Sequence, residues 1–357
     1  MKLENQTLLV ISNEPWGDIW YSKHNWAYEL SKKNKVFFIN PPIKWKISNL
    51  WSFKICIDDY SESLKVLGYQ NILPLTRFSL IYKLNNFIVS KKIKKWLLNN
   101  NYKKYIFWTF DPYRFSNPQL FSPLLSIYFR VDKYRIQKEK ILLKNIDKLV
   151  VTSKELLKDI TFNGSVLELS HGISSEEFVP TNTVNYEKDY FLYVGNIDHR
   201  LNIELIDRIL QEFPNERFVF IGKMYNLFSK LSQDIFSKNK YNNLIVHGVE
   251  HFKNLKNYIY YSKACLVPMD LKIHGNAVHH HKTLQYLALG KPVISPIFND
   301  VINKEEYIIA YKNDDEAIEK IKQLTYIETN EKVAQRIQFA QQFTYEKLIE
   351  KVEQFLR

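Results

Sequence analysis

The chain has 357 residues, of which 45% are hydrophobic, so it is long enough for two domains of ordinary size. Fifty Lys and Arg against 38 Asp and Glu give a net charge of +12, which favours anionic partners; biased codon usage explains a Lys-rich composition equally well. Two distant cysteines, Cys56 and Cys265, exclude a disulfide framework and a Cys-based metal site, and they indicate a reducing compartment.

The N-terminal residues do not resemble a targeting segment. MKLENQTLLVISNEP lacks the apolar run and the small-residue cleavage site of a signal peptide. No stretch reaches the ~18–20 uninterrupted apolar residues that a spanning helix needs. We therefore expect a cytoplasmic protein that can still touch a membrane surface as a peripheral protein.

In the first half of the chain, short runs rich in Val, Ile and Phe alternate with helical patterns. A helix is expected at about 24–32, after the first of these runs. The predicted strands are TLLVIS (7–12), KVFFIN (35–40), YIFWTF (105–110), SIYFRV (126–131), KLVVTS (148–153) and SVLELS (165–170). Strands separated by helices predict βαβ units and a parallel sheet covered on both faces.

The polar stretch PTNTVNYEK (180–188) has no periodicity and predicts a linker, after which the alternation restarts. A helix is expected at 203–213, and the strands are YFLYVG (190–195), RFVFIG (217–222), NLIVHG (243–248), KACLVPM (263–269) and KPVISP (291–296). We predict an α/β fold of two Rossmann-like domains, residues 1–180 and 181–343. A final helix, 344–357, is expected to return to the first domain by fold analogy.

Ligands of open parallel sheets bind beyond the carboxyl ends of the strands, so the candidate site residues lie there. The loop after the first strand combines aromatic and polar side chains, which suit stacking and hydrogen bonding with a sugar. Trp16 and Tyr21 are candidates for acceptor binding, and Asp18 and His24 are catalytic candidates, with a structural role as the alternative. Trp26, inside the predicted helix, is expected to be a core residue.

Two aspartates follow later strands of the first domain. Asp111 comes after 105–110, and Asp132 comes after 126–131. A carboxylate at the end of a strand is a candidate general base. We predict a catalytic role for Asp132 and an acceptor-binding role for Asp111. An ion pair with Arg130 is the alternative role of Asp132.

In the second domain, glycines and cations follow the strands. Gly195 permits a tight turn, and the helix N-terminus after it can bind a phosphate, with Arg200 as a direct ligand. Lys223 follows the next strand in the same way, and His247 ends a third strand, where backbone groups could contact a nucleobase. The complete G-x-G-x-x-G fingerprint is missing, so a dinucleotide is not supported.

The segment HHHKTLQYLALGKPVISP (279–296) contains the strongest candidate. A helix that begins near 281–282 would direct its first turn at a diphosphate, with Lys282 and Thr283 as ligands. Gln285 lies on the same face and can bond to ribose hydroxyls, while Gly290 ends the helix. Adjacent histidines point in different directions and no Asp-x-Asp triplet exists, so neither a metal site nor a cofactor is expected.

KTLQYLALGKPVIS (282–295), with YVGNIDHRLNIELIDRI (193–209) and YYSKACLVPM (260–269), resembles the C-terminal half of GT-B glycosyltransferases. These enzymes have two Rossmann-like domains facing across a cleft and use nucleotide sugars. WGDIWYS (16–22), VDKY (131–134) and HGI (171–173) are similar to segments of bacterial polysaccharide enzymes of the teichuronic acid type, so the resemblance covers nearly the whole chain.

The chain departs from the large retaining group of this fold. Where that group carries two glutamates, this chain has Ala277 and Gln285. Lys282 with Gln285 is more similar to the inverting glucuronosyltransferases of xanthan-type assembly, which use a first-domain aspartate as base. In an inverting reaction that base deprotonates the acceptor, and Arg200, Lys223 and Lys282 stabilise the departing diphosphate. A retaining reaction needs no such base, and both mechanisms stay open here.

The resemblance implies a metal-independent transferase of the hexosyltransferase type. Its donor would be a nucleotide sugar, UDP-linked, and its acceptor a glycan or a lipid-linked glycan in bacterial surface polysaccharide assembly, such as a capsule or lipopolysaccharide. Two other functions are considered. A nucleotide-sugar 2-epimerase on the same fold would need additional carboxylates near 275–282, and a basic nucleic-acid-binding protein would need an RNA or DNA module that this sequence lacks.

Two basic segments of the first domain predict a membrane contact. Residues 80–105 form a basic amphipathic helix with Trp96, and residues 43–54 place two tryptophans among lysines. Such segments are typical of binding to an anionic leaflet, and an ordinary solvated helix is the alternative. The expected partners are therefore a nucleotide sugar, an acceptor and an anionic membrane surface, with no nucleic acid.

Overall fold

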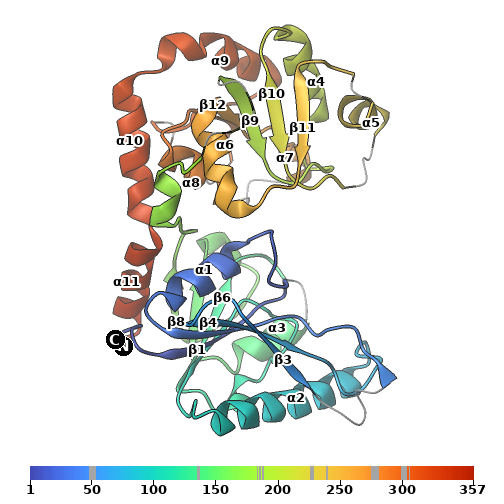
Figure 1. Ribbon diagram of the computed structural model, residues 1–357, viewed down its shortest axis with the longest axis vertical. Coiled ribbons are helices and arrows are strands. Elements are labelled where there is room, and N and C mark those ends of the chain that lie inside the picture. The colour runs from blue at the N-terminus through green and yellow to red at the C-terminus, as the bar shows by residue number, and fades with distance from the viewer. Residues whose placement is uncertain are drawn as a thin grey trace. The chain divides into compact units, whose positions relative to one another are not determined.

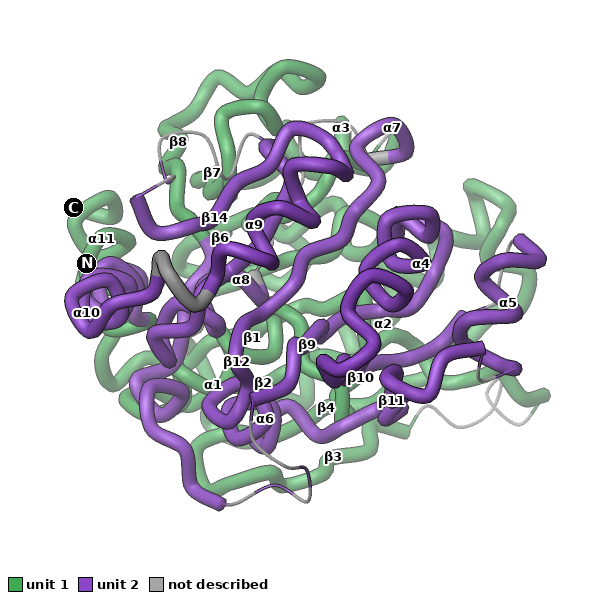
Figure 2. Tube along the Cα trace, turned by 90° about the horizontal axis from the view of Figure 1, so that it is seen from above, with its two compact units in different colours: residues 1–170, 345–357 green, residues 171–344 purple. Residues whose placement is uncertain are grey.

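The computed structural model describes residues 1–47, 54–134, 137–182, 184, 186, 189–225, 229–238, 240–274, 281–298, 304 and 306–357. They fall into two compact units (Figure 2). Unit 1 comprises Met1–Ser170 and Tyr345–Arg357, and unit 2 comprises His171–Thr344. The segment 171–180, which we had assigned to the first domain, thus belongs to unit 2.

Unit 1 is built on an eight-stranded sheet with the order β3-β4-β2-β1-β5-β6-β7-β8. Every neighbouring pair is parallel except β3 with β4. The strands are β1 Thr7–Ile11, β2 Lys35–Ile39, β3 Ile55–Asp59, β4 Leu64–Tyr69, β5 Ile106–Thr109, β6 Leu125–Arg130, β7 Lys148–Val151 and β8 Ser165–Glu168. The six strands expected from the sequence are confirmed, whereas β3 and β4 were missed.

Helices cover both faces of this sheet (Figure 1). The helices of unit 1 are α1 Ser22–Ser31, α2 Ser79–Asn99, α3 Gln137–Leu143 and α11 Tyr345–Phe355, with 3₁₀ turns η2 Pro118–Phe121 and η3 Lys154–Leu157. Successive side chains of a strand point to opposite faces, so Leu8 and Val10 pack with α1 and α11, while Leu9 and Ile11 pack with α2. Trp26 of α1 is fully buried, as expected for a core residue.

Unit 2 contains a six-stranded parallel sheet with the order β11-β10-β9-β12-β13-β14. Its strands are β9 Tyr190–Val194, β10 Phe218–Ile221, β11 Leu244–Gly248, β12 Ser262–Leu266, β13 Val293–Pro296 and β14 Ile309–Tyr311. The helices are α4 Ile203–Glu212, α5 Lys230–Phe236, α6 Leu255–Tyr261, α7 Leu271–His274, α8 His281–Ala288, α9 Asp314–Ile327 and α10 Asn330–Ala340, with 3₁₀ turns η4 Ser175–Phe178, η5 Phe252–Asn254 and η7 Gln341–Phe343.

The strongest sequence candidates lie on α8, His281–Ala288, in the region where the sequence predicted a helix. The helix ends before Gly290, whose φ of +69° is the left-handed conformation typical of a glycine after a helix. A Cβ there would also lie 2.6 Å from Val333 of α10, because the two helices pack together. These constraints fix the orientation of α8 in unit 2.

Candidate functional site

Three neighbouring strands of unit 2 end at glycines. Gly195 N donates a hydrogen bond to Ile221 O at 2.9 Å, and Gly222 N donates to Gly248 O at 2.7 Å. Gly222 has a φ of +154°, and a Cβ on it would lie 1.9 Å from Gly195 O. Only glycine fits that position, so the ends of β9 and β10 meet backbone to backbone.

A tyrosine connects α8 to this end of the sheet. Tyr286 is buried, and its Oη accepts a hydrogen bond from Val194 N, 2.9 Å away at the end of β9. Val194 immediately precedes Gly195, so the bond places the first turns of α8 beside the glycine turn. Tyr286 therefore anchors α8, the helix that carries Lys282, Thr283 and Gln285, to the carboxyl end of β9.

A carboxylate that the sequence analysis missed lies beside these residues. Glu177 of η4 accepts a hydrogen bond from Gln285 Nε2, and its other oxygen accepts one from Ser174 N at 3.2 Å. Ser174 and Glu177 form a capping box, and this S-x-x-E pattern was the available signal in the sequence. The pattern gives no information about the helix that Glu177 contacts.

Burial perturbs both charged groups of this cluster. It raises the pKa of the Glu177 carboxyl, although hydrogen bonds from Gln285 and Ser174 N and the charge of Lys282 oppose the shift. Burial lowers the pKa of Lys282, and the charge of Glu177 opposes that shift. The two groups thus partly compensate each other in a poorly hydrated region.

Two buried polar atoms of α8 lack hydrogen-bond partners among the described residues. They are Thr283 Oγ1 and Gln285 Oε1. An unpaired buried polar atom costs about 1–3 kcal/mol, and structures keep few of them. Both residues were candidates for donor binding, and a ligand hydroxyl or phosphate oxygen has the right chemistry to bond with them. Ala277, His279 and His280 lie outside the described residues.

The other cation near the end of β9 is already paired. Arg200 donates from Nε and Nη2 to the carboxylate of Asp198, at 2.8 and 2.7 Å. These bonds lower the pKa of Asp198, although its burial acts in the opposite direction. The N-terminus of α4 is capped by the Asn202 side chain, which accepts from Leu205 N at 3.0 Å. Arg200 therefore has less capacity for a phosphate than the sequence suggested.

Lys223 follows β10, and His247 lies at the end of β11. Lys223 is exposed, and its Nζ lies 5.0 Å from the centre of the Tyr225 ring. His247 has both ring nitrogens engaged, with Tyr186 Oη at 2.5 Å and Glu250 Oε2 at 3.2 Å. The side chain of His247 is thus held inside unit 2. Its backbone role in donor binding stays a prediction.

In unit 1, His24 is buried in the loop after β1. Its Nδ1 accepts a hydrogen bond from Tyr21 N, and its Nε2 lies 3.0 Å from Pro15 O, which requires the Nε2–H tautomer. Burial lowers its pKa to about 4, so the ring is neutral near pH 7. With no free nitrogen and no exposure, His24 shapes the loop, and we correct its assignment from catalytic to structural.

Asp111 is likewise a structural residue. Its Oδ2 accepts from Arg114 Nε at 2.6 Å, and its Oδ1 accepts from Tyr113 N at 2.7 Å. Arg114 also donates to Ser12 O, to Asn40 O at 2.8 Å and to Tyr69 Oη at 2.8 Å. Because Asp111 is buried in this network, it is not placed to bind an acceptor, contrary to our expectation.

The two remaining aspartates, Asp18 and Asp132, are exposed. The alternative ion pair between Asp132 and Arg130 is wrong, because Arg130 is buried and pairs with Glu139 and Asp159, at 2.7 and 2.9 Å. Burial lowers the pKa of Lys23, and the charges of Glu14, Asp111 and Asp132, which follows β6, oppose that shift. Asp132 is therefore a solvent-accessible carboxylate near a buried cation.

The aromatic side chains of the loop after β1 form a cluster. Trp16 is half-buried, and its ring centre lies 4.8 Å from that of Trp20 and 5.0 Å from that of Tyr60. Tyr21 is exposed, with Lys23 Nζ 5.5 Å from its ring centre. Trp16 and Tyr21 thus keep accessible ring surface, which their predicted contact with an acceptor sugar requires.

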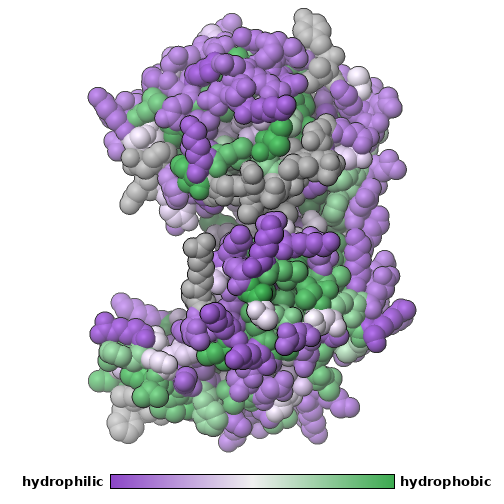
Figure 3. Space-filling view, turned by 180° about the vertical axis from the view of Figure 1, so that it is seen from behind, coloured by the Kyte–Doolittle hydropathy of each residue, from purple (hydrophilic) through white to green (hydrophobic). Residues whose placement is uncertain are grey.

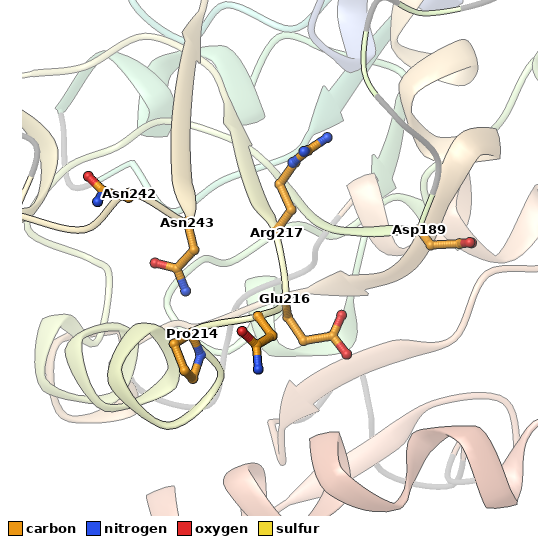
Figure 4. A pocket seen from close by; sticks show the side chains of 7 residues that line it. Asp189, Pro214, Glu216, Arg217, Asn242 and Asn243 are labelled. Atoms are coloured by element: carbon orange, nitrogen blue, oxygen red, sulfur yellow. The ribbon is translucent and has the colours of Figure 1, made fainter.

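A cavity of about 350 Å³ lies at the opposite end of the unit 2 sheet (Figure 4). Six of the residues around it are Asp189, Pro214, Glu216, Arg217, Asn242 and Asn243. These residues lie just before the first residues of β9, β10 and β11, so the cavity is at the amino ends of these strands. Ligands of parallel sheets bind at the other end. Among the described residues, no group of three His, Cys, Asp or Glu is placed to hold a metal ion.

No protein-family model and no curated protein matches the sequence. Solved structures match over nearly the whole chain. They include sucrose-phosphate synthase from Thermosynechococcus elongatus (TM-score 0.71, 15% identity, covering 99% of this chain and 98% of that one). A glycosyltransferase from Rickettsia africae gives a TM-score of 0.69 at 14% identity, covering 98% of each chain.

A third match is a UDP-forming α,α-trehalose-phosphate synthase from Burkholderia xenovorans, in complex with glucose-6-phosphate. Its TM-score is 0.68 at 9% identity, and the alignment covers 99% of this chain and 100% of that chain. At such low identities the likeness establishes the fold. The chain has the α/β GT-B fold with two Rossmann-like units, as the sequence predicted.

Proposed function

We propose that the protein is a glycosyltransferase of the hexosyltransferase type that uses a UDP-linked sugar. The observation that carries the proposal is the first turn of α8, where Thr283 and Gln285 hold buried polar atoms without described partners beside Lys282. The structural likeness to a UDP-forming synthase and to a sucrose-phosphate synthase supports a nucleotide-sugar donor. Gly195, Lys223 and His247 complete the proposed donor site, and Arg200 contributes if it releases Asp198.

In the inverting form of the reaction, the acceptor hydroxyl attacks the anomeric carbon while the bond from that carbon to the diphosphate oxygen breaks. A base takes the hydroxyl proton, and Lys282 stabilises the charge that develops on the departing diphosphate. Asp132 is the proposed base, because it is exposed at the end of a strand whereas Asp111 is buried and paired. Neither a metal ion nor a cofactor enters this scheme.

The acceptor is proposed to be a glycan or a lipid-linked glycan of a bacterial surface polysaccharide, such as a capsule or lipopolysaccharide. The sequence resemblance to teichuronic acid and xanthan-type enzymes supports this part of the proposal. We propose that the protein lies in the cytoplasm, peripheral on the inner face of the membrane. No described helix is both long and apolar enough to cross a bilayer.

A thermal-shift screen against nucleotide diphosphates and nucleotide sugars tests the proposal. A ligand at about 100 times its Kd stabilises a protein by about 2.7 kcal/mol, so UDP is expected to raise the unfolding temperature measurably. Once a donor is found, the matched variants Asp132→Asn and Asp58→Asn test the base, because Asp58 is an exposed aspartate of β3 in the same unit. We expect loss of turnover for the first and near-normal turnover for the second. Stabilisation by no nucleotide at all would contradict the transferase assignment.

A nucleotide-sugar 2-epimerase is the second candidate, and Glu177 is the observation that favours it. Such an enzyme needs carboxylates near the nucleotide sugar, and Glu177 provides one next to Gln285. The two candidates differ in their need for an acceptor. Conversion of a nucleotide sugar to its epimer in the absence of any acceptor would establish the epimerase, whereas release of UDP on addition of an acceptor would establish the transferase.

A further inference from the structure

The segment between Glu62 and Asp111 contains nine Lys and Arg residues and no Asp or Glu. The net charge of the whole chain is +12, so this one segment carries most of it. The segment includes all of α2, Ser79–Asn99. This helix of 21 residues has no Asp or Glu, so its lysines cannot form ion pairs within the helix. Their uncompensated positive charge attracts anionic surfaces.

One side of α2 is the ordinary core side. Val89, Ile93 and Leu97 are buried and pack with the β1 and β2 residues that face this side of the sheet. The opposite side is also apolar over its N-terminal half. Leu80, Leu84 and Phe87 follow one another at helical spacing and are exposed, with Leu80 at 80% of its full surface. Lys91 and Lys95 continue the same exposed side.

The loop before α2 extends this surface. Leu75 and Phe78 are exposed, and Leu75 has a φ of +61°, a left-handed conformation that is unfavourable for leucine. The loop is held firmly, because the buried Asn85 accepts from Ile72 N and Leu73 N at 3.0 and 2.9 Å. An exposed leucine is thus displayed in a strained conformation on a fixed loop, and strain of this kind occurs at functional positions.

We name as the α2 face the exposed apolar residues Leu75, Phe78, Leu80, Leu84 and Phe87 with the cations Arg77, Lys83, Lys91 and Lys95. Hydrophobic side chains gather over this end of unit 1 at the lower left of Figure 3. Isolated exposed apolar residues are common, but five together on one side of a helix and its preceding loop indicate an interaction surface.

We propose that the α2 face docks unit 1 on an anionic lipid bilayer, with the apolar residues in the interfacial region and the lysines at the headgroups. The charge complementarity selects this occupant, because an apolar strip flanked only by cations matches an anionic leaflet. Trp45 Nε1 donates to Ile72 O at 3.0 Å, so the loop with exposed Ile47, Lys44 and Lys46 adjoins the same surface. The purpose of the docking, access to a lipid-linked acceptor, rests on the proposed function, whereas the docking itself does not.

Flotation of the full chain with vesicles, in the absence of donor and acceptor, tests the docking. We compare phosphatidylcholine alone with an equimolar mixture of phosphatidylcholine and phosphatidylglycerol. Binding is expected only to the mixture, and it should weaken as salt is raised because headgroup attraction is screened. Each lysine near such a surface contributes a factor of about five, so Lys91→Gln with Lys95→Gln should weaken binding about 25-fold.

Two further variants separate the apolar part from the charge. Leu80→Gln with Phe87→Gln should weaken binding about 10-fold or more, because the apolar side chains no longer insert. Leu75→Gly should also weaken binding while it leaves the unfolding temperature unchanged or higher, since glycine tolerates a positive φ. Circular dichroism checks that each variant is folded.

The matched control is Lys347→Gln with Lys351→Gln on α11. It removes the same charge from exposed positions of unit 1, on a helix that also carries three glutamates. Its binding should stay close to that of the unmodified chain. Absent flotation with the mixture, or equal flotation of the α2 and α11 variants, would overturn the proposal. A dimer of the unmodified chain that Leu80→Gln with Phe87→Gln dissociates, without flotation, would instead assign the face to a second copy.

The docking and the sugar transfer can fail separately. If the chain floats but no nucleotide stabilises it, docking through the α2 face is supported and the transferase function is contradicted. If UDP stabilises the chain but the chain does not float, the donor site is supported and the docking is contradicted. The flotation assay contains no nucleotide, so neither result depends on the other.

Discussion

In unit 1, one guanidinium joins the ends of four strands, whereas in unit 2 three strands end at glycines that meet backbone to backbone. Arg114 donates to Ser12 O, Asn40 O, Tyr69 Oη and Asp111, which follow or end β1, β2, β4 and β5. In unit 2, Tyr286 of α8 is hydrogen-bonded to Val194 N at the end of β9, and the same helix has polar atoms that lack described partners.

The difference separates strand ends that are closed by a hydrogen-bond network from strand ends near polar groups without described partners. A closed network of hydrogen bonds leaves no polar group for a ligand, while buried groups without partners lower the cost of binding one. By this criterion we expect the donor to bind to unit 2. In unit 1, only the exposed side chains around the network, such as Asp132 and Tyr21, are available to a ligand.

Removing the Arg114 network is expected to have the largest effect. Arg114→Leu leaves the buried Asp111 carboxylate without its partner, and breaking a buried ion pair in this way costs about 3–5 kcal/mol. All seven tryptophans lie at or before position 108, so tryptophan fluorescence in urea reports on unit 1 alone. Arg77→Leu, at an exposed position, is the control. Equal stability of the two variants would show that the network does not hold unit 1 together.

The buried histidine of unit 1 provides a pH test of the same assignment. The pKa of His24 falls from 6.5 to about 4 on folding, because burial disfavours the imidazolium. The unfolded chain therefore binds the proton more readily, and stability is lost as the pH falls from about 6.5 to about 4. The loss is about 3 kcal/mol. It should be absent in His24→Gln when both chains are followed by tryptophan fluorescence. A parallel pH dependence of the two chains would contradict the neutral, buried state of His24.

In unit 2, Lys282→Ala tests the proposed donor site. Removal of a group that stabilises developing charge costs about 10²–10³-fold in turnover, and the fold should survive because Lys282 is not a core residue. The measurement is release of UDP in the presence of an acceptor. Lys230→Ala, an exposed cation at the start of α5, is the matched control in the same unit. Turnover of Lys282→Ala at the level of the control would remove Lys282 from the mechanism.

Local patterns in the sequence were sufficient for most of the fold. Eleven of the strands and the helix α8 follow from apolar runs and turn residues, which are short-range signals. The strand β3 was missed because it pairs only with β4 and has an exposed, acidic end at Asp58 and Asp59. The strand β14 has three residues, too few for a periodic signal.

The site could be predicted only in part, for a related reason. Lys282 and Gln285 were chosen as candidates because a helix start after a polar segment is a local feature, and their role in donor binding stays a prediction. Glu177 lies 108 residues before its partner Gln285, and nothing in either segment specifies that contact. The composition of the loop after β1 also could not distinguish a catalytic histidine from one that hydrogen bonds to its own loop, as His24 does.

Glu177 gives the test with the smallest expected effect on the comparison of the two units. Its carboxyl caps η4 and also accepts a hydrogen bond from Gln285 of the proposed donor site. Glu177→Gln keeps an acceptor for Gln285 Nε2 and a capping-box residue, but it removes the charge beside Lys282. Burial raises the folded-state pKa of Glu177 above 4.5, so its contribution to stability is full below that pH and is lost as the pH rises. The variant should therefore match the unmodified chain in acid and exceed it in stability near pH 7.

Unfolding followed by circular dichroism measures this pH-dependent difference, and a nucleotide titration measures the second effect of the same change. We expect donor affinity to fall by about 5-fold, on the order of one hydrogen bond, because Lys282 loses the carboxylate that favours its charged form. Glu176→Gln, the exposed neighbour in η4, should change neither quantity. If Glu177→Gln altered stability equally at all pH values and left nucleotide binding unchanged, Glu177 would only be a cap of η4, and the donor site would be confined to α8 and the glycine turns.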